Sequence, residues 1–489
     1  MSAKFMSRRQ LLKGAGVAIA GASAAALAAC QPKVVEVTRV VKETVVVKGE
    51  EKVVEKVVKE TVVQEKVVEK TVVVEKAAEV KILRIHWRLG GVRPHYKDVM
   101  AEMEQTFPGV KMNSEEFPAG SAEFGPKVGA MISAGVAGDI VWCAIGSGSF
   151  QFFAAYNALA ALDEFIAIDK SGFTLDAYFP RVVAAMRMGP EGQGSGNLYA
   201  IPEVAHGTYQ CLFSNNDLLQ QLGLPLPPRD DSWSREDLLD VALKATSEAD
   251  RRFGFLPTTG GYSEIRHTTL AFGGELMSDD GKKSLIESEG VKAGTRWLHD
   301  CFFKHHVAPL PAEQTGGSSQ MFLGGRLAMF QSGTWGLETM KSLVKDRFKW
   351  DMILIPKGPA GVRGGHLHAD GFGVLAASKY KDLAYEFCKM ITNEKYVRRY
   401  AVEVNGLTAR FDTYEDPKAR EAQPFWKEIK QSIEEADEHL GPANLRKQES
   451  QTLIKALFDP LWVGDEQPDD AWFAKTSAEW QNFLDKPRE

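Results

Sequence analysis

The sequence predicts an α/β fold, arranged in two lobes, for residues 81–489 of a 489-residue chain. Short β-rich runs alternate with helical runs in this part, which is typical of strand–helix–strand units around a largely parallel sheet. The part exceeds the roughly 250–300 residues at which a single hydrophobic core stops growing. All ten tryptophans lie in it, so it also holds the side chains best suited to fill two cores. We call residues 81–489 the body.

Residues 1–30 have the composition of an export signal. They contain Lys4, Arg8, Arg9 and Lys13 and no acidic residue, and a run of small apolar residues follows at 15–29. This run is shorter than the ~20 residues that span a bilayer, which favours a signal peptide over a transmembrane anchor.

Two finer motifs lie on this segment. Ser-Arg-Arg-Gln-Leu-Leu-Lys at 7–13 resembles the twin-arginine export motif, and Leu-Ala-Ala-Cys at 27–30 resembles a bacterial lipobox. The sequence therefore predicts a twin-arginine lipoprotein signal peptide with a lipid on Cys30. That lipid would hold the protein outside the cytoplasm, at the outer face of the cell membrane. A plain signal peptide with an incidental cysteine is the alternative.

Residues 31–80 form a low-complexity segment that we call the stalk. It holds ten basic residues, ten acidic residues and 20 valines, with no aromatic residue. Its valine pairs recur mostly five residues apart, which fits neither the helical period of 3.6 nor the strand period of 2. Valine favours an extended backbone. We expect a solvated spacer, with a self-associating coiled coil or β-stack as the alternative.

The elements of the body begin with a strand at 81–87 and a helix at 96–106. A strand at 110–115, a helix at 124–134 and a fully apolar strand at 139–144 follow. In such folds, binding sites form outside the carboxyl ends of the strands. The body has ten more acidic than basic residues, which argues against nucleic acid as a partner. We expect it to be monomeric.

Motifs of catalysis and cofactor binding are missing from the sequence. There is no HExxH, GxSxG or GxxxxGK[ST] string, and the GxGxxA string at 371–376 itself reads as a strand. No constellation of carboxylates and cysteines joins the histidine pairs at 305/306 and 366/368 in sequence, so surface or hydrogen-bonding histidines are expected there, with a metal site as the alternative. The cysteines after the stalk stand singly in apolar stretches, which predicts buried free thiols: Cys143, Cys211, Cys301 and Cys388. We expect no metal, no cofactor and no enzyme activity, so a binding protein is the leading class.

A series of short motifs then follows in a characteristic order. They are Gly-Asp-Ile-Val-Trp at 138–142, Leu-Tyr-Ala-Ile-Pro at 198–202, Leu-Phe-Ser-Asn-Asn-Asp at 212–217, Asp-Ser-Trp-Ser-Arg-Glu-Asp-Leu at 231–238, Leu-Ala-Phe-Gly-Gly-Glu at 270–275, Met-Phe-Leu-Gly-Gly-Arg-Leu-Ala-Met at 321–329, Gly-Thr-Trp at 333–335, Ile-Pro-Lys-Gly at 355–358 and the run 376–393. In this order, the body resembles a family 1 extracellular solute-binding protein, the maltose/oligosaccharide-type receptor of an ABC importer. Gly138 stands where the family usually has proline.

The resemblance implies a periplasmic-binding-protein-like fold of type II, with two hinge-linked lobes and a ligand cleft. One lobe would comprise 81–207 plus 368–420, and the other 208–367 plus 421–489. The protein would bind a sugar or oligosaccharide between the lobes and deliver it to the permease subunits by hinge closure. The alternative is a non-sugar or acidic solute, such as a uronate, a peptide or a polyol.

Candidate ligand contacts are aromatic faces for the apolar side of a sugar and polar groups for its hydroxyls. The resemblance makes Trp335, in the Gly-Thr-Trp motif, the first candidate, with a core role as the alternative. Trp87 ends the first strand, and Arg88 or Arg93 are its alternates. Further candidates lie on loops or at the expected hinge: Ser147, Ser149, Glu203, His206, Tyr209, Asp370 and Arg410. Asp139 is expected to cap local structure, and Arg410 follows Thr408-Ala409 where the family has proline.

Overall fold

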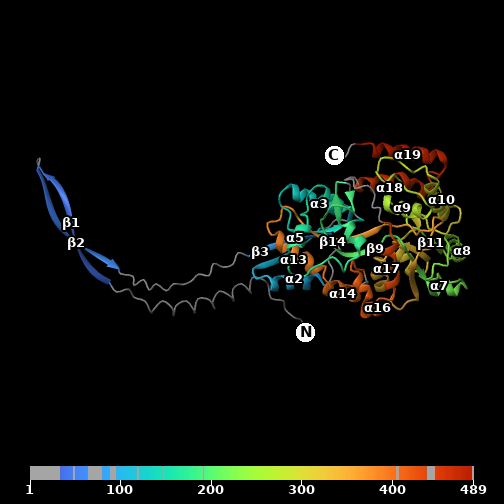
Figure 1. Cartoon of the computed structure of the whole chain (residues 1–489), viewed down its shortest axis with the longest axis horizontal. Coiled ribbons are helices and arrows are strands. Elements are labelled where there is room, and N and C mark those ends of the chain that lie inside the picture. The colour runs from blue at the N-terminus through green and yellow to red at the C-terminus, as the bar shows by residue number, and fades with distance from the viewer. Residues whose placement is uncertain are drawn as a thin grey trace, which may run out of the picture. The chain divides into compact units, whose positions relative to one another are not determined.

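The computed structural model describes residues 34–47, 50–63, 80–88, 95–117, 121–146, 148–190, 192–403, 407–437 and 447–486. The chain divides into two compact units, Met1–Ala78 and Glu79–Glu489. Figure 1 labels their elements. The export motifs, with Cys30, lie outside the described residues, as do Arg93 and Ser147. In the described parts of the chain, no helix is both long enough and apolar enough to cross a bilayer.

The first unit contains a β-hairpin. Strands β1 (Val34–Val47) and β2 (Glu50–Val63) pair antiparallel along their whole length, from Val34 opposite Val63 to Val47 opposite Glu50. Valine's preference for an extended backbone agrees with these strands. A search for a periodic apolar face along one strand cannot detect such pairing within one chain, and the solvated spacer stays a prediction. Two adjacent valine-rich strands also satisfy each other's backbone hydrogen bonds, without any such face.

The second unit, the body, is built on two large sheets. The first has the strand order β4-β3-β5-β14-β9 and the second the order β11-β12-β10-β13. The strands of the first sheet are β3 (Lys81–Arg88), β4 (Val110–Phe117), β5 (Ile140–Ala144), β9 (Ile201–Gly207) and β14 (Leu367–Val374). Those of the second are β10 (Cys211–Asn215), β11 (Phe253–Leu256), β12 (Leu327–Ser332) and β13 (Trp350–Leu354). A small third sheet contains β6 (Arg187–Gly189), β7 (Gly192–Gln193) and β8 (Asn197–Leu198).

Both large sheets are mixed, because each contains one strand, β14 in the first and β10 in the second, that runs opposite to the others; the expectation of a largely parallel sheet holds for the remaining strands. β3 runs parallel to β4 and β5, but β14 runs antiparallel to both β5 and β9. In the second sheet β11 and β12 are parallel, whereas β10 is antiparallel to β12 and β13. The reason is that β14 does not follow a crossover helix of its own sheet. It arrives from the second sheet and therefore enters the first in the opposite direction.

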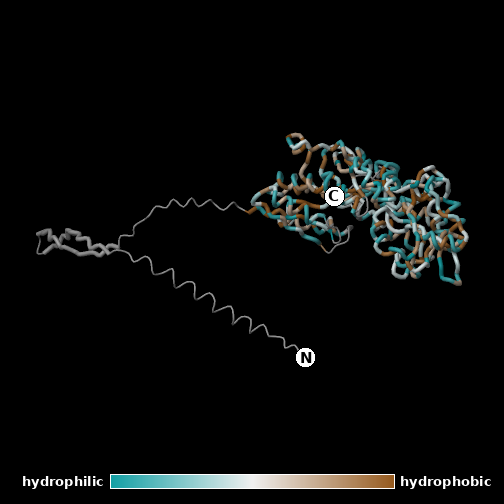
Figure 2. Tube along the Cα trace, turned by 90° about the horizontal axis from the view of Figure 1, so that it is seen from below, coloured by the Kyte–Doolittle hydropathy of each residue, from teal (hydrophilic) through white to brown (hydrophobic). Residues whose placement is uncertain are grey.

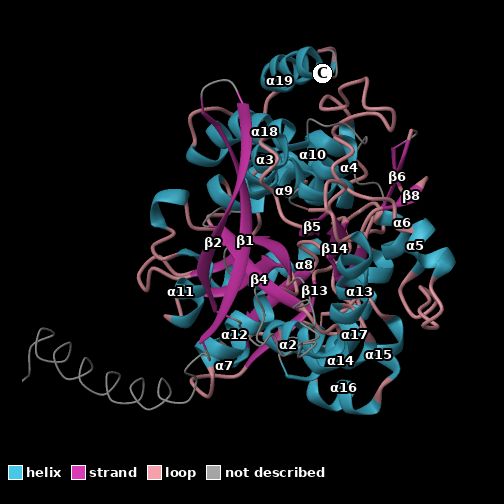
Figure 3. Cartoon of the chain, turned by 90° about the vertical axis from the view of Figure 1, so that its left-hand side faces the viewer, coloured by secondary structure: helices cyan, strands magenta, loops and turns pink. Residues whose placement is uncertain are grey.

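Helices cover the strands of both sheets (Figure 3). Those that follow strands of the first sheet are α2 (Tyr96–Thr106), α3 (Ser121–Ser133), α4 (Ser149–Ala155), α5 (Asp163–Ile168), α6 (Pro180–Ala185), α13 (Lys381–Ile391), α14 (Glu394–Glu403), α15 (Phe411–Glu415) and α16 (Pro417–Ala422). Those associated with the second are α7 (Asn216–Gln221), α8 (Arg235–Ala245), α9 (Tyr262–Ala271), α10 (Glu289–Phe303), the 3₁₀ helix η1 (Pro311–Glu313), α11 (Gly317–Leu323), α12 (Gly336–Val344), α18 (Lys447–Val463) and α19 (Asp470–Leu484). In Figure 1, α2, α3 and α13 lie at one end of the body and α7, α8 and α10 at the other.

Local sequence accounts for several of these elements. Ser234 and Asp237 form a capping box at the start of α8, in which each side chain binds the other residue's backbone N–H. Hydrophobic and hydrophilic stretches alternate along the chain of the body (Figure 2), as expected for elements with one buried and one exposed face. The five elements expected between residues 81 and 144 are confirmed to within a few residues by β3, α2, β4, α3 and β5.

Candidate ligand-binding site

Two chain segments connect the two large sheets, and a third lies beside them; we call these three segments the crossings. Residues 208–210 lead from β9 to β10, and residues 355–366 lead from β13 to β14. The third segment, 436–437, follows α17 (Trp426–Glu435), which packs on β9 and β13 and so touches both sheets. The segments hydrogen-bond to one another: Thr208 N donates to His366 O and Asp437 N to Gly365 O, each over 3.0 Å. The expected lobe boundaries at 207/208 and 367/368 lie at two of these crossings, while the assignment of residues to lobes stays a prediction.

An exposed tryptophan lies beside the crossings. Trp335 follows the carboxyl end of β12, and its ring centroid is 5.0 Å from that of His206 and 5.3 Å from that of Tyr209. A Cβ on Gly333 would lie 1.8 Å from the Trp335 ring, so only glycine lets the indole fold back against this turn. Even so, Trp335 keeps 39% of its surface exposed. An indole held in place by its neighbours and open on one side suits the C–H face of a sugar ring.

Two histidines and a carboxylate extend this aromatic surface across the first sheet. His206 of β9 and His368 of β14 are opposite each other in the register and stack with centroids 4.7 Å apart. Gly146 N donates to His368 Nδ1 over 2.8 Å, which places the ring proton on Nε2. His368 Nε2 then donates to Asp370 Oδ1 over 2.9 Å. The chain Gly146–His368–Asp370 thus orients a carboxylate, a good acceptor for hydroxyl groups.

Tyr209 is fixed by contacts on several sides. Its φ of +54° is in the left-handed region, which non-glycine residues adopt only when their surroundings hold them there. Gln331 Nε2 donates to Tyr209 O over 2.8 Å, and Tyr209 Oη donates to Glu264 of α9. Burial and the negative charge of Glu264 raise the pKa of Tyr209, which keeps the phenol protonated. The Tyr209 ring is therefore held in one orientation beside the Trp335 ring.

Two of the described arginines, Arg266 and Arg410, are paired with carboxylates. Arg266 of α9 donates to Glu275, with an Nε–Oε1 distance of 2.6 Å, and to Asp437. Arg410 binds Asp412 over 2.6 Å and lies over the Tyr178 ring. Two arginines that could have attracted an acidic ligand are thus neutralised inside the protein.

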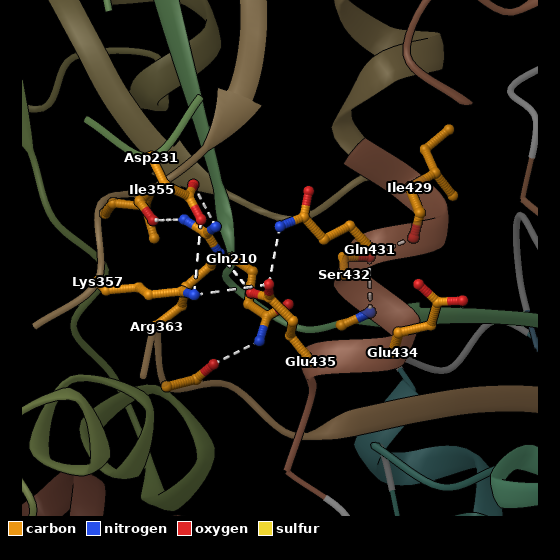
Figure 4. Close-up of polar contacts among 12 residues, drawn as sticks. Gln210, Asp231, Ile355, Lys357, Arg363, Ile429, Gln431, Ser432, Glu434 and Glu435 are labelled. Atoms are coloured by element: carbon orange, nitrogen blue, oxygen red, sulfur yellow. Dashed lines mark hydrogen bonds and ion pairs between the residues drawn. The ribbon is translucent and has the colours of Figure 1, made fainter. Parts of the chain in front are cut away.

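Arg363 forms the tightest of these networks (Figure 4). Its side chain is fully buried, donates to Ile355 O and Glu435 Oε2 over 2.7 Å each, and also binds Asp231. Lys357 adds a second positive charge, with Nζ 3.6 Å from Asp231 and 3.8 Å from Glu435. Burial opposes ionisation of Asp231, but Arg363 and Lys357 outweigh it and lower the pKa of this carboxyl. These ion pairs join the second crossing to the end of α17.

The same end of α17 is held from the first sheet. Arg181 of α6 donates to Ile433 O and Ala436 O over 2.6 Å each, which satisfies carbonyls that a helix leaves free at its carboxyl end. Arg181 of α6 and Arg363 of the 355–366 segment therefore both hold the carboxyl end of α17.

Of the predicted site residues, the structure brings together Trp335, His206, Tyr209 and Asp370. Trp87 is not among them: it is fully buried, stacks on Tyr96 at 4.8 Å and donates to Ser114 Oγ over 2.7 Å. The prediction of Trp87 as a ligand contact does not agree with this burial, because the ring packs in the core against Tyr96 of α2. Its alternate, Arg88, lies over the Trp142 ring.

Three other predicted contacts also have internal roles. Glu203 is 1% exposed and accepts from Tyr96 Oη over 2.6 Å. Ser149 is buried, and its Oγ accepts from Ala144 N over 3.0 Å. Arg410 is held by Asp412, as described above. Asp139, expected to cap local structure, instead accepts from two groups distant in sequence, Arg84 N over 2.9 Å and Ser378 Oγ over 2.6 Å.

Sequence reasoning missed His368, Glu264 and Gln331. His368 was considered only as half of a histidine pair, although its position two residues before Asp370 on one strand face was a usable signal. Glu264 and Gln331 had no such signal, because α9 and β12 meet Tyr209 only through the tertiary fold.

The cysteine prediction is confirmed: Cys143, Cys211, Cys301 and Cys388 are free and buried. Burial raises the pKa of these thiols, so they are unreactive side chains of the core. In the described part of the body, no three His, Cys, Asp or Glu residues gather as a metal site.

Three solved structures share the fold of the body. An ABC substrate-binding protein of Listeria monocytogenes, in complex with cycloalternan, is 19% identical, with a TM-score of 0.72 over 83% of this chain and 99% of its own. Maltose-bound MalE3 of T. maritima is 21% identical, with a TM-score of 0.67 over 82% and 99%. An ABC transporter solute-binding protein of Agrobacterium vitis S4, with bound D-mannitol, is 18% identical, with a TM-score of 0.66 over 83% and 98%.

These likenesses show that the fold is the two-lobed α/β fold of periplasmic binding proteins, as the motifs had implied. At the level of sequence, a family model described as bacterial extracellular solute-binding protein matches residues 98–426, well over half of the chain. This family binds solutes and does not catalyse reactions. The protein belongs to the bacterial extracellular solute-binding protein family.

Proposed function

We propose that the protein is the extracytoplasmic receptor of an ABC importer and that its solute is a sugar or oligosaccharide. The observation that carries the proposal is the exposed Trp335 indole, held by His206 and Tyr209 at the carboxyl end of β12. A flat apolar surface bordered by imidazole and carboxylate groups matches a pyranose, which has an apolar C–H face and a rim of hydroxyls. The cycloalternan and maltose complexes of structures with this fold support the same class.

In this proposal Trp335 and Tyr209 contact the ring face of the solute. Asp370 and His206 bind its hydroxyls, with His368 orienting Asp370 through the 2.9 Å hydrogen bond. Ser147 lies outside the described residues and stays a candidate. Glu203, Ser149, Trp87 and Arg410 are not included, since each is engaged elsewhere.

A polyol is the second candidate, because the Agrobacterium vitis protein of this fold binds D-mannitol. An acidic solute such as a uronate is less well supported. Arg266 and Arg410, two of the cations that would attract it, are already paired with carboxylates. Pairing of this kind leaves little net positive charge for an anionic ligand.

Solute would bind between the lobes and draw them together by rotation at the three crossings. The closed form would then dock on the permease subunits, while a separate subunit hydrolyses ATP. A lipid on Cys30 would keep the receptor at the outer face of the cell membrane. The lobes are those expected from the sequence, 81–207 plus 368–420 and 208–367 plus 421–489.

Calorimetric titration of residues 79–489 tests the solute class. Maltose, maltotriose, D-mannitol and D-galacturonate represent the neutral sugars, the polyols and the acidic sugars. We expect saturable binding of at least one neutral sugar. A solute at 100 times its dissociation constant should also raise the free energy of unfolding by about 2.7 kcal/mol. If only D-mannitol binds, the solute is a polyol, and if only D-galacturonate binds, it is an acidic sugar. If none of the four binds, the proposal that the solute is a neutral sugar is refuted.

A further inference from the structure

One buried positive charge of the body has no carboxylate beside it. Among the described residues, four lysine and arginine side chains are buried. Arg266, Arg363 and Lys389 each form an ion pair with at least one carboxylate. Arg235, the first residue of α8, is 0% exposed and forms no ion pair within the described chain. Burying an unpaired charge is costly, so Arg235 needs a counter-charge that the described residues do not supply.

The contacts of Arg235 leave most of its donors unsatisfied. Its Nη2 donates to Arg363 O over 3.2 Å, and its Cζ lies 5.4 Å from the centroid of the Trp297 ring. Its Nε and Nη1 are buried and have no hydrogen-bond partner. Burial lowers the pKa of Arg235 only to about 9, so the guanidinium stays charged at neutral pH. Of the acidic groups that act on it, the Cys301 thiol is kept protonated by burial, and Glu236 is exposed.

His267 of α9 supplies a second unsatisfied donor. Thr258 N donates to Gln331 Oε1 over 3.2 Å, which fixes the orientation of this amide and turns its Nε2 toward His267 Nε2. His267 Nε2 therefore accepts, and the ring proton lies on Nδ1. This Nδ1 is buried and has no hydrogen-bond partner. Burial and the charge of Arg235 lower the pKa of His267, so the ring stays neutral.

The 355–366 segment brings both side chains to the same part of the interior. Gly364 has a φ of +78°, and a Cβ on it would lie 1.8 Å from His267 O and 3.3 Å from His267 Nδ1. Arg363 O, which accepts from Arg235, belongs to the peptide that joins Arg363 to Gly364. His267 and Arg235 thus border this peptide from α9 and α8. The unsatisfied groups of both are donors, and one of them carries a positive charge.

A small anion satisfies these groups better than water does. A water molecule accepts hydrogen bonds but leaves the charge of Arg235 uncompensated. An anion accepts the same hydrogen bonds and also neutralises the charge. Arg235 and His267 are both 0% exposed, which favours a small ion without its hydration shell over a larger solute.

We propose that Arg235 and His267 hold a small monovalent anion, of the chloride class, in the interior between α8, α9 and the 355–366 segment. The anion accepts from the guanidinium and from His267 Nδ1. Gln331 hydrogen-bonds to both His267 and Tyr209, but the anion itself is not one of the proposed solute contacts. The proposal therefore does not depend on which solute the body binds.

Urea denaturation tests the site in the whole chain carrying Cys30→Ser, which prevents lipid attachment, in non-ionic detergent. Tryptophan fluorescence reports on the body, which holds all ten tryptophans. Sodium chloride replaces sodium methanesulfonate, whose anion is bulkier, in steps at constant ionic strength. An ion that binds only the folded state, at 100 times its dissociation constant, raises the ratio of folded to unfolded protein about 100-fold. We expect the urea midpoint to rise with chloride and then to saturate.

Three variants assign the effect to residues. Arg235→Met removes the charge and keeps a long unbranched side chain, so it should abolish the chloride dependence while the protein still folds without chloride. Arg296→Met is the matched control, because Arg296 is a partly exposed arginine of α10, and it should keep the full dependence. His267→Leu removes one donor and should raise the chloride concentration at half effect about tenfold or more.

Crystals of the unsubstituted protein grown in sodium bromide give a measurement that needs no variant. Bromide replaces chloride, and its anomalous scattering should give a peak in contact with the Arg235 guanidinium.

Four results would overturn the proposal. A urea midpoint that does not respond to chloride would mean that water satisfies these donors. An unchanged response in Arg235→Met, or a bromide map without a peak at Arg235, would place any bound ion elsewhere. An unchanged half-effect concentration in His267→Leu would remove His267 from the site. None of these measurements involves a solute, so their failure is distinct from failure of the sugar proposal.

Discussion

Replacing Trp335 by alanine should weaken solute binding far more than it weakens the fold. The indole is 39% exposed. For a tryptophan of about 250 Å², that leaves about 100 Å² for a solute to cover. At about 25 cal/mol per Å², this contact is worth about 2.5 kcal/mol, or a rise in the dissociation constant of about 70-fold.

The assay is calorimetric titration of residues 79–489 and of the Trp335→Ala variant with the neutral sugar that the four-solute titration shows to bind. Trp335→Phe is the matched control, because it keeps an aromatic face at the same turn and should lose less affinity than alanine. Melting of both variants without solute reports on folding. We expect a modest loss of stability, since part of the indole packs against Gly333, His206 and Tyr209.

An unchanged dissociation constant in Trp335→Ala would refute the reasoning, because the exposed face would then touch no solute. A large fall in the melting temperature with unchanged affinity would assign Trp335 to the core instead.

Three further predictions concern the surroundings of the site and the core. Trp87→Ala should cost about 3–5 kcal/mol of unfolding free energy in urea denaturation, as for any large buried aromatic residue, while the solute affinity of the folded protein changes little. Gly146→Ala puts a Cβ 2.1 Å from His368 Nδ1 and should lower solute affinity in calorimetry, at a cost of about 1–3 kcal/mol in stability. Burial disfavours the charged form of Asp169, but hydrogen bonds from Lys389 and neighbouring groups outweigh it and hold its pKa well below the usual range. The native state thus binds fewer protons than the unfolded state, so stability should fall as the pH drops below about 4, and Asp169→Asn should flatten that part of the urea-measured pH profile.

Local sequence patterns were enough for the elements of the body's first sheet. β3 and β5 were found because each is a short apolar run between turn-forming residues, and α2 because its apolar residues recur at helical spacing. The direction of β14 was not predictable in this way. Its residues read as a strand, but whether it runs parallel or antiparallel depends on the 355–366 segment, which crosses from the other sheet.

In the candidate ligand-binding site, too, the sequence predicts some residues correctly, and only the tertiary structure decides others. Trp335, His206, Tyr209 and Asp370 were proposed from their motifs and their places beside the hinge, and the fold gathers all four. Trp87 looked equivalent in sequence, yet it stacks on Tyr96 in the core. A tryptophan at the end of a strand has the same local pattern whether its ring points outward or inward, so the distinction needs the helix that packs against it.

The sequence by itself determined the α/β class and the solute-binding family of the body, because these follow from periodicity and ordered motifs along the chain, while the export leader stays a prediction from composition. Only the tertiary structure decided which side chains face a solute and which arginines are already neutralised. It also decided the pairing of the valine-rich stalk as a hairpin. These properties depend on partners distant in sequence: Glu264 against Tyr209, Asp437 against Arg266, and Val58 against Arg39. Contacts of this kind have no local signature, because the folding of the whole chain brings them together.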